Sequence, residues 1–211
     1  MMLYLSSYRL GNEEEFLKKW VKSHDKKVLI IINAQDIYPD DDLREERNLN
    51  KCADLLQVGF EPEILDLREY FNKPHELRRK LANYRTFYVI GGNTFVLRRA
   101  MMMSGFDKYL HDISSNDEYL YIGYSAGICV LGHDLHGVSL EDDPYIDPYG
   151  LKEVIWNGVG LIDFMPIPHY GTYDSSYSTE VYMKEHGQKY QALRDGEVII
   201  MKIEKVTTKT S

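Results

Sequence analysis

A serine stands between small residues in the run Gly123-Tyr124-Ser125-Ala126-Gly127. A serine hydroxyl is a weak nucleophile, and enzymes that use one hold it on a sharp strand-to-helix turn with a base beside it. Small residues flank the serine because this turn brings backbone segments close together. The bare pattern also occurs by chance in turns, but here an apolar strand precedes it and an apolar helix follows. We therefore predict that Ser125 is the nucleophile of a serine hydrolase.

Two turns could supply amide N–H groups to the oxyanion of such a reaction. The first amide after a nucleophile often serves this role, which makes the Ala126 N–H one candidate. The run Gly91-Gly92-Asn93-Thr94 ends another apolar strand and starts another helix, and we predict that its Gly92 N–H is the second donor. This turn could also be purely structural. A phosphate-binding loop is disfavoured because the Walker lysine and the G-x-G-x-x-G spacing are both missing.

The base must come from seven histidines. His169 follows the apolar run 164–168 and precedes Tyr170, so it lies at the mouth of a buried segment, where a base should be; a structural histidine is the alternative. His133 and His136 have a spacing that a metal ion could use, but no further ligand set is evident. We therefore expect no metal and no organic cofactor.

An acid that orients the base could come from Glu141-Asp142-Asp143, which lies between Ser125 and His169. Such an acid holds the imidazole in the correct tautomer and stabilises the imidazolium. A charged loop of this kind is usually only solvated, and position alone does not choose among the three residues.

The elements that must position these residues alternate between strands and helices. The β-branched run 28–32 is apolar on both faces, as a central parallel strand is. Further strands are predicted at 63–67, 87–90 and 119–124, with helices starting near Asn12, Asp40, His75, Thr94 and Ser125. The helix that begins near Asp40 ends at Gly59 and carries Leu49, Cys52, Leu55 and Leu56 near one stripe. Strands 190–193 and 198–203 around Asp195-Gly196 are predicted to form a hairpin.

This alternation predicts an α/β fold with a doubly wound, mostly parallel sheet and an antiparallel edge, in one domain over residues 1–211. In such sheets the ligand lies at the carboxyl ends of the strands, where both glycine turns fall.

Composition excludes several classes of protein. The net charge is −8 and no basic patch or run appears, so a nucleic-acid partner is not expected. No segment approaches the roughly 18 apolar residues that span a bilayer, and the first nine residues lack a signal-peptide pattern. Cys52 and Cys129 form no recognisable disulfide framework. We expect a cytoplasmic protein without membrane contacts, either a monomer or a homodimer.

Four runs together resemble the peptidase E (aspartyl dipeptidase) and cyanophycinase family of serine peptidases. The runs are 89–95, 122–127, 142–148 and 166–170. The resemblance implies a three-layer α/β fold related to class I glutamine amidotransferases. It implies Ser125 as nucleophile, His169 as base and Asp142 as the acid, with Asp143 the alternative. It also matches Gly92 and Ala126 to the oxyanion positions.

The sequence departs from this family in its specificity region. Family dipeptidases commonly carry arginines after the catalytic histidine, which bind the aspartyl side chain, but no arginine occurs between Tyr170 and Leu193. Tyr124 replaces a tryptophan, and Ile90 replaces the first of three glycines; both changes are tolerable. We expect a dipeptidase-like serine peptidase that hydrolyses short peptides, with aspartyl preference in doubt. The alternatives are a non-catalytic binding or regulatory protein on the same fold, or an amidase or esterase.

Overall fold

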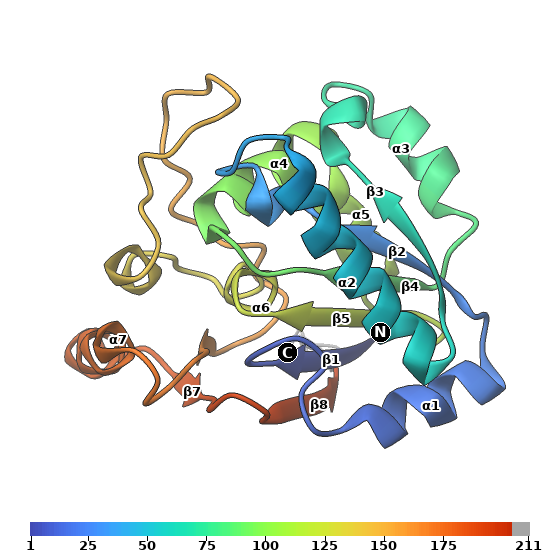
Figure 1. Ribbon diagram of the computed structural model, residues 1–211. Coiled ribbons are helices and arrows are strands. Elements are labelled where there is room, and N and C mark those ends of the chain that lie inside the picture. The colour runs from blue at the N-terminus through green and yellow to red at the C-terminus, as the bar shows by residue number, and fades with distance from the viewer. Residues whose placement is uncertain (204–211) are drawn as a thin grey trace, which may run out of the picture.

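The central sheet has six strands within the part of the chain that the structure, a computed structural model, describes (residues 1–203). The last eight residues of the domain predicted over 1–211 lie outside it. The strand order is β3-β2-β4-β5-β1-β8 (Figure 1). The strands are β1 (Met2–Ser6), β2 (Lys27–Ile31), β3 (Glu61–Leu65), β4 (Thr86–Val89), β5 (Leu120–Tyr124) and β8 (Val198–Lys202). Every pairing from β3 to β1 is parallel, and β8 is antiparallel to β1. The predicted α/β fold with an antiparallel edge is confirmed.

Helices cover both faces of this sheet. The longer helices are α1 (Glu14–Ser23), α2 (Asp42–Val58), α3 (Pro74–Leu81), α4 (Thr94–Ser104), α5 (Phe106–Ile113) and α7 (Asp174–Glu185). Leu29 and Ile31 of β2 belong to a core with α3, α4 and α5, whereas Val28 and Ile30 belong to a second core with α1 and α2. Successive side chains of a strand point to opposite faces, so a strand covered on both faces is apolar throughout. No helix in residues 1–203 is both long and apolar enough to cross a membrane.

Shorter elements connect these layers. They are η1 (Asn33–Gln35), η2 (Leu67–Tyr70), α6 (Ala126–Cys129), η3 (Gly137–Leu140), β6 (Met165–Ile167) and β7 (Tyr190–Ala192). The register pairs Ser6 with Tyr124 and Val89 with Gly123, so β1, β4 and β5 end side by side. The residues that follow these three strands therefore share one edge of the sheet.

Helix α2 has the predicted ends, but only Cys52 and Leu55 of the predicted apolar stripe pack on the core. The Asp41 side chain accepts the Arg44 N–H at its start, and Gly59 ends it with a φ of 100°. However, the exposed fractions of Leu49 and Leu56 are 60% and 59%. Arg44 and other polar residues take buried positions instead, because the first half of the helix packs on a polar network described below.

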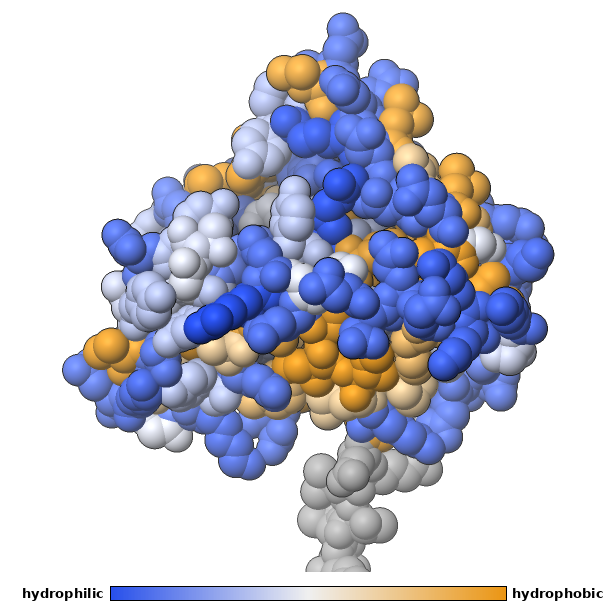
Figure 2. Space-filling model, turned by 60° about the horizontal axis from the view of Figure 1, so that its bottom comes forward, coloured by the Kyte–Doolittle hydropathy of each residue, from blue (hydrophilic) through white to orange (hydrophobic). Residues whose placement is uncertain are grey.

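The hairpin predicted around Asp195-Gly196 is wrong. β7 pairs with β6 in a separate two-stranded sheet, and β8 pairs with β1 at the edge of the main sheet. Figure 2 shows the side of the molecule that is at the bottom of Figure 1, near β8, where hydrophobic side chains gather between polar ones. Four of the five β8 residues are only partly buried, as expected of an edge strand.

Candidate active site

Ser125 lies on the turn between β5 and α6, as predicted. Its backbone has a φ of 50° and a ψ of −119°, a conformation that residues other than glycine rarely adopt. A Cβ atom at Gly127 would collide with the carbonyl oxygen of Val89, so the chain after the serine needs glycine to pass close to β4. The serine itself is partly exposed. The local backbone therefore holds Ser125 in a strained position at the end of the sheet.

The Gly91-Gly92 turn lies directly against this serine. A Cβ atom at Gly91 would be 3.0 Å from the Ser125 Cβ. Gly92 has a φ of 154°, and a side chain there would collide with the carbonyl oxygen of Ala34 in η1. The N–H groups of Gly92 and Ala126 donate no hydrogen bond within residues 1–203. Both predicted donors are thus free to bind a ligand beside Ser125.

His169 is held from two sides. Its backbone has a φ of 55°, and its N–H donates to the Ser7 hydroxyl at 2.7 Å. Its ring Nδ1 is 2.7 Å from Asp195 Oδ1. The Ser7 hydroxyl donates to the same oxygen at 2.8 Å. A carboxylate at Nδ1 fixes the proton there and leaves Nε2 to act as the base.

The sheet register brings this histidine to the serine. Ser7 follows β1 directly and Ser125 follows β5 directly, and these strands are paired up to Ser6 and Tyr124. The Tyr8 ring contacts both the His169 ring and the Tyr124 ring, with centroids 6.0 and 6.2 Å apart. No hydrogen bond joins Ser125 to His169 among the described residues. Such bonds are often long before substrate binds.

The structure pairs His169 with Asp195 and not with Asp142, the acid that the sequence analysis assigned. The Asp142 carboxylate points to the start of α4 and accepts the Thr94 N–H at 2.8 Å. Asp143 is exposed, and its carboxylate accepts the Tyr145 N–H. Glu141 accepts the Thr179 hydroxyl at 2.9 Å. Each of the three candidate acids therefore has another partner.

Glu141 and Asp142 nevertheless reach the serine, because they line one small pocket with it. The pocket offers about 30 Å³ of space that a water-sized group can enter. Burial raises the pKa of both carboxyl groups, and the charge of Asp142 raises the pKa of Glu141 further. The pocket is lined by Thr94, Ser125, Ala126, Cys129, Val138, Glu141, Asp142, Pro166, Pro168 and Thr179.

Other candidate groups lie outside this arrangement. Burial raises the pKa of the Cys129 thiol well above its usual range, so Cys129 is a poor rival nucleophile. His136 stacks on Trp156, and its Nδ1 is 2.5 Å from Asp134. Within residues 1–203, no group of three or more His, Cys, Asp or Glu side chains is placed to hold a metal ion.

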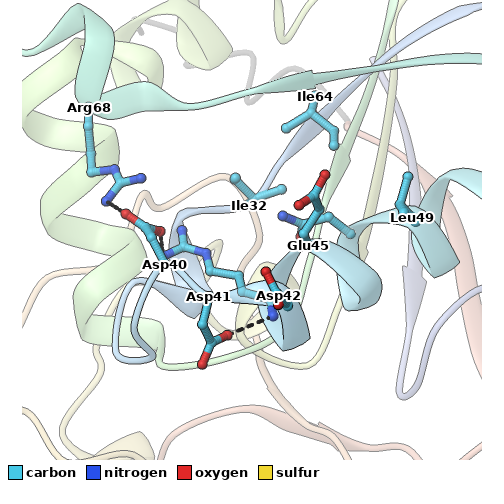
Figure 3. Close-up of a pocket in the computed structure, with 10 residues that line it drawn as sticks. Ile32, Asp40, Asp41, Asp42, Glu45, Leu49, Ile64 and Arg68 are labelled. Carbon is cyan, nitrogen blue, oxygen red and sulfur yellow. Dashed lines mark hydrogen bonds and ion pairs between the residues drawn. The ribbon is translucent and has the colours of Figure 1, made fainter.

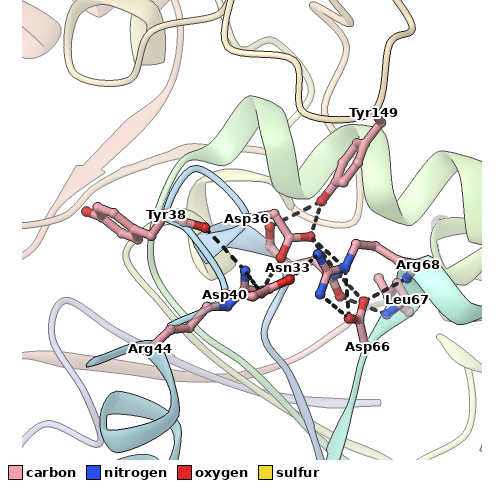
Figure 4. A network of polar contacts seen from close by, with 9 residues as sticks. All are labelled: Asn33, Asp36, Tyr38, Asp40, Arg44, Asp66, Leu67, Arg68 and Tyr149. Atoms are coloured by element: carbon pink, nitrogen blue, oxygen red, sulfur yellow. Dashed lines mark hydrogen bonds and ion pairs between the residues drawn. The ribbon is translucent and has the colours of Figure 1, made fainter. Parts of the chain in front are cut away.

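A polar network lies behind the glycine turn, after β2 and β3 (Figure 4). Asn33 donates to Asp36 and to Asp66, each at 2.8 Å. Asp36 also pairs with Arg44 and accepts the hydroxyl of Tyr149. This network fixes η1, whose Ala34 contacts the Gly92 turn.

A larger cavity of about 380 Å³ opens beside this network (Figure 3). It is lined by acidic residues at the start of α2, including Asp41 and Glu45, and by the paired Arg44 and Arg68. Ser125 does not line it. Another cavity, lined by Ser23 and Asn83 among others, is larger still at about 440 Å³. Cavity volume therefore does not single out the pocket that Ser125 lines.

Sequence reasoning missed Ser7 and Asp195. In the sequence, Asp195 belongs to a predicted turn, and Ser7 belongs to an N-terminal stretch with no recognisable motif. The only available signal is that Asp195 is an acidic residue 26 positions after His169. No local motif connects Asp195 with His169.

Comparison with known proteins gives consistent relatives. A family model described as peptidase family S51 matches residues 3–209. Two uncharacterised peptidases, from Listeria monocytogenes and Listeria innocua, are 28% identical over 137 residues and 29% identical over 125 residues. These stretches cover 64% and 58% of this chain. They span 64% and 57% of the two relatives, which is less than two thirds of their length.

Two solved structures share the fold. A 1.5 Å crystal structure of a Listeria monocytogenes protein assigned to peptidase E has a TM-score of 0.70 and 23% identity, covering 96% of this chain and 98% of that one. A peptidase from an acI-B1 actinobacterium has a TM-score of 0.67 and 16% identity, covering 95% and 83%. At sequence identities of 23% and 16%, these two structures establish only that the fold is shared. The family assignment rests on the family model, which matches almost the whole sequence. The chain belongs to peptidase family S51, the peptidase E family.

Proposed function

We propose that this protein is a serine peptidase that hydrolyses short peptides with Ser125 as nucleophile and His169 as base. The observation that carries the proposal is the strained Ser125 turn beside a histidine whose Nδ1 is held 2.7 Å from Asp195. In this proposal Asp195, and not Asp142, is the acid that orients the base. Membership of a peptidase family supports peptide hydrolysis as the reaction.

The reaction follows from the positions of these groups. The Ser125 hydroxyl attacks a peptide carbonyl carbon while His169 Nε2 accepts its proton. The resulting oxyanion accepts hydrogen bonds from the free N–H groups of Gly92 and Ala126. The carbon–nitrogen bond then breaks, and His169 gives its proton to the leaving amine. Water, activated by the same histidine, releases the acyl group and restores the serine.

Asp195 has a defined task in this scheme. It keeps the His169 proton on Nδ1, so that Nε2 is unprotonated when the serine is attacked, and it stabilises the imidazolium. Ser7 supports both partners, since its hydroxyl accepts the His169 N–H and donates to Asp195. Aspartyl preference is not part of the proposal, because the region after His169 lacks the arginines of the family dipeptidases. Free Cys52 and Cys129 are compatible with work in the reducing cytoplasm.

A fluorophosphonate probe, which reacts with activated serines, tests the proposal. We expect labelling of the full-length protein at Ser125 and none in Ser125→Ala. Asp195→Asn should slow labelling by about 10³- to 10⁴-fold, because the imidazole loses its correct tautomer. Asp142→Asn should slow it much less. A larger effect of Asp142→Asn than of Asp195→Asn would return Asp142 to the role of orienting acid. Absence of labelling in well-folded protein would favour a non-catalytic member of the family.

A further inference from the structure

Two exposed tyrosine side chains flank the ring of His169. The Tyr173 ring centroid is 5.7 Å from that of His169, with an interplanar angle of 73°, and the Tyr8 centroid is 6.0 Å away, with an angle of 61°. Both are edge-to-face contacts of the kind that aromatic pairs favour. Tyr173 is 57% exposed and Tyr8 is 50% exposed. Large aromatic surface therefore lies open to solvent directly beside the candidate base.

The Tyr8 side chain is placed by the elements that place the nucleophile. Tyr8 follows the end of β1 by two residues, and its carbonyl oxygen accepts the Ser6 hydroxyl and the Gly11 N–H, each at 3.1 Å. Its ring also meets the ring of Tyr124, at a centroid distance of 6.2 Å and an angle of 82°. Tyr124 directly precedes Ser125, so the Tyr8 ring packs between the nucleophile turn and the base.

A tight turn brings Tyr173 back to the histidine. The Thr172 N–H donates to the His169 carbonyl oxygen at 2.8 Å. The Ser176 hydroxyl donates to the Tyr173 carbonyl oxygen at 2.7 Å, at the start of α7, and accepts the Gly171 N–H at 3.2 Å. The backbone of Tyr173 is therefore fixed on both sides, and its ring stands against the base because of this turn.

The proposed reaction indicates which part of a peptide meets these rings. His169 gives its proton to the leaving amine, so that nitrogen must come within hydrogen-bond distance of the imidazole. The side chain of the leaving residue begins at the second atom beyond this nitrogen and must lie close to the histidine. The small pocket on which Ser125 also opens is lined by neither Tyr8 nor Tyr173. The two rings thus border a different side of the serine from that pocket.

We propose that Tyr8 and Tyr173 form two walls of a subsite for the side chain of the leaving residue, and that this subsite selects large apolar and aromatic residues. The inference rests on the proposed peptidase function. It narrows the substrates to short peptides in which such a residue follows the cleaved bond.

The chemistry around the rings supports this substrate class. Contact with an aromatic ring removes apolar surface from water, so it favours apolar side chains and aromatic ones above all. The cation next to Tyr8 in the chain is already occupied, because Arg9 donates two hydrogen bonds to Asp54, at 2.9 and 3.0 Å. An acidic side chain would also meet the partly exposed Asp195 beside the histidine. The subsite therefore disfavours acidic leaving residues.

Two dipeptide libraries test the subsite in the full-length protein. One holds the twenty X-Phe dipeptides and the other the twenty X-Gly dipeptides, so the preferred first residue need not be known. Release of phenylalanine and of glycine gives kcat/KM for each library. We expect the wild type to favour X-Phe by about ten-fold. Tyr8→Ala and Tyr173→Ala should each reduce this preference by about three- to ten-fold, through a loss on X-Phe and not on X-Gly.

Matched variants separate binding by the rings from their support of the histidine. Tyr8→Phe and Tyr173→Phe keep each ring and should keep the wild-type preference. Tyr145→Ala removes a tyrosine that is more exposed still and should keep it as well. A fluorophosphonate releases fluoride and has no leaving residue, so it reports on Ser125 and His169 alone. Its rate of reaction with Ser125 should change by less than about two-fold in all five variants, since the base keeps its partner Asp195.

The outcomes distinguish this inference from the proposed function. Equal turnover of the two libraries, or turnover of neither, by protein whose Ser125 is labelled would refute the subsite and leave the nucleophile assigned. An equal loss of both turnovers and of labelling in Tyr8→Ala and Tyr173→Ala would make the rings supports of the base and refute it too. A changed choice among first residues would move the rings to the acyl side. Absence of both labelling and turnover would remove the peptidase function and this inference together.

Discussion

Two groups of acidic side chains lie near the carboxyl ends of the strands, and they differ in whether a cation neutralises them. Asp36 and Asp66 meet the arginines Arg44 and Arg68, and the Asp36 side chain is only 2% exposed. Glu141 and Asp142 lie beside Ser125 and meet no arginine or lysine in the described part of the chain. In the first group the negative charges are balanced by arginines. In the second group no arginine or lysine of the described residues balances them.

Their titration reflects this difference. Burial by itself raises the pKa of Asp66, but hydrogen bonds from Arg68 and Asn33 outweigh burial, and the pKa is lowered overall. For Glu141 and Asp142 burial dominates, and the pKa of each is raised. Perturbed groups of the second kind, in a cleft with a nucleophile, are typical of binding and catalytic sites. The comparison therefore separates acids that are paired with cations within the fold from acids that lie beside Ser125 without a lysine or arginine partner.

The two groups are mechanically connected. Tyr149 donates to Asp36, and Arg99, which is 1% exposed, donates to the carbonyl oxygens of Pro144, Ile146 and Glu153. These contacts hold the long segment after Asp142 that has no regular structure. Tyr149 thus links the paired network to the segment that follows the unpaired acids, and Arg99 holds the same segment independently.

The largest expected effect comes from removing a cation from the paired network. Arg44→Met leaves Asp36 buried, with Arg68 Nε at 3.8 Å as the remaining ion-pair partner. We expect the free energy of unfolding in urea to fall by about 3–5 kcal/mol. Arg78→Met removes an exposed pair with Asp112 and should cost less than about 1 kcal/mol. If both substitutions lowered the free energy of unfolding equally, the buried network would contribute no more to stability than an exposed ion pair.

Matched substitutions of one acid from each group sharpen the contrast. Asp36→Asn removes the charge that Arg44 needs and should cost about 1.5–3 kcal/mol. Asp142→Asn keeps an oxygen for the Thr94 N–H and removes a charge that has no cation, so it should cost much less. Urea unfolding of both variants at neutral pH gives the comparison. A more costly Asp142→Asn would place Asp142 among the structural acids.

The pH dependence of stability should run in opposite directions. A raised pKa, as for Glu141, means that the folded state holds the proton more tightly; that stabilisation is complete below the unfolded pKa of about 4.3 and is lost as pH rises through the folded pKa. Asp142, Thr179 and His169 face this group. Asp66, with its lowered pKa, contributes stability above about pH 3.9 that is lost as pH falls.

Unfolding free energies of Glu141→Gln and Asp66→Asn, measured from pH 3 to 7, would show the two trends. Relative to the wild type, Glu141→Gln should gain stability as pH rises, and Asp66→Asn should lose it. Parallel trends would contradict the assignment of the two acids to different groups.

The fold was largely predictable because its signals are local. Strand β5 was predicted at 119–124 and lies at Leu120–Tyr124, because a strand that is buried on both faces is marked in the sequence by a continuous run of mostly apolar residues. β1 was missed, because its sequence Met-Leu-Tyr-Leu-Ser contains none of the β-branched residues that marked β2. The false hairpin arose because Asp195-Gly196 does form a turn, while the partners of β7 and β8 are distant in sequence.

The same distinction explains which site residues were found. Ser125 and Gly92 lie in turns whose backbone requires small neighbouring residues, so both can be recognised from a short stretch of sequence. Asp195 meets Ser7 and His169 because β8 pairs with β1, with Ser6 opposite Val198. The two paired strands lie at opposite ends of the sequence, so no local residue spacing indicates that Ser7, His169 and Asp195 meet.

The smallest expected effect concerns two threonines of the acidic pocket. The Thr179 hydroxyl donates to Glu141 at 2.9 Å, whereas the buried Thr94 hydroxyl lies near Asp142 and Cys129 and forms no well-aligned hydrogen bond within residues 1–203. Thr179→Val should therefore lower the unfolding free energy by about 1 kcal/mol, and Thr94→Val should leave it unchanged or raise it by up to about 1 kcal/mol. A loss of stability in Thr94→Val as large as in Thr179→Val would instead make both hydroxyls part of the scaffold.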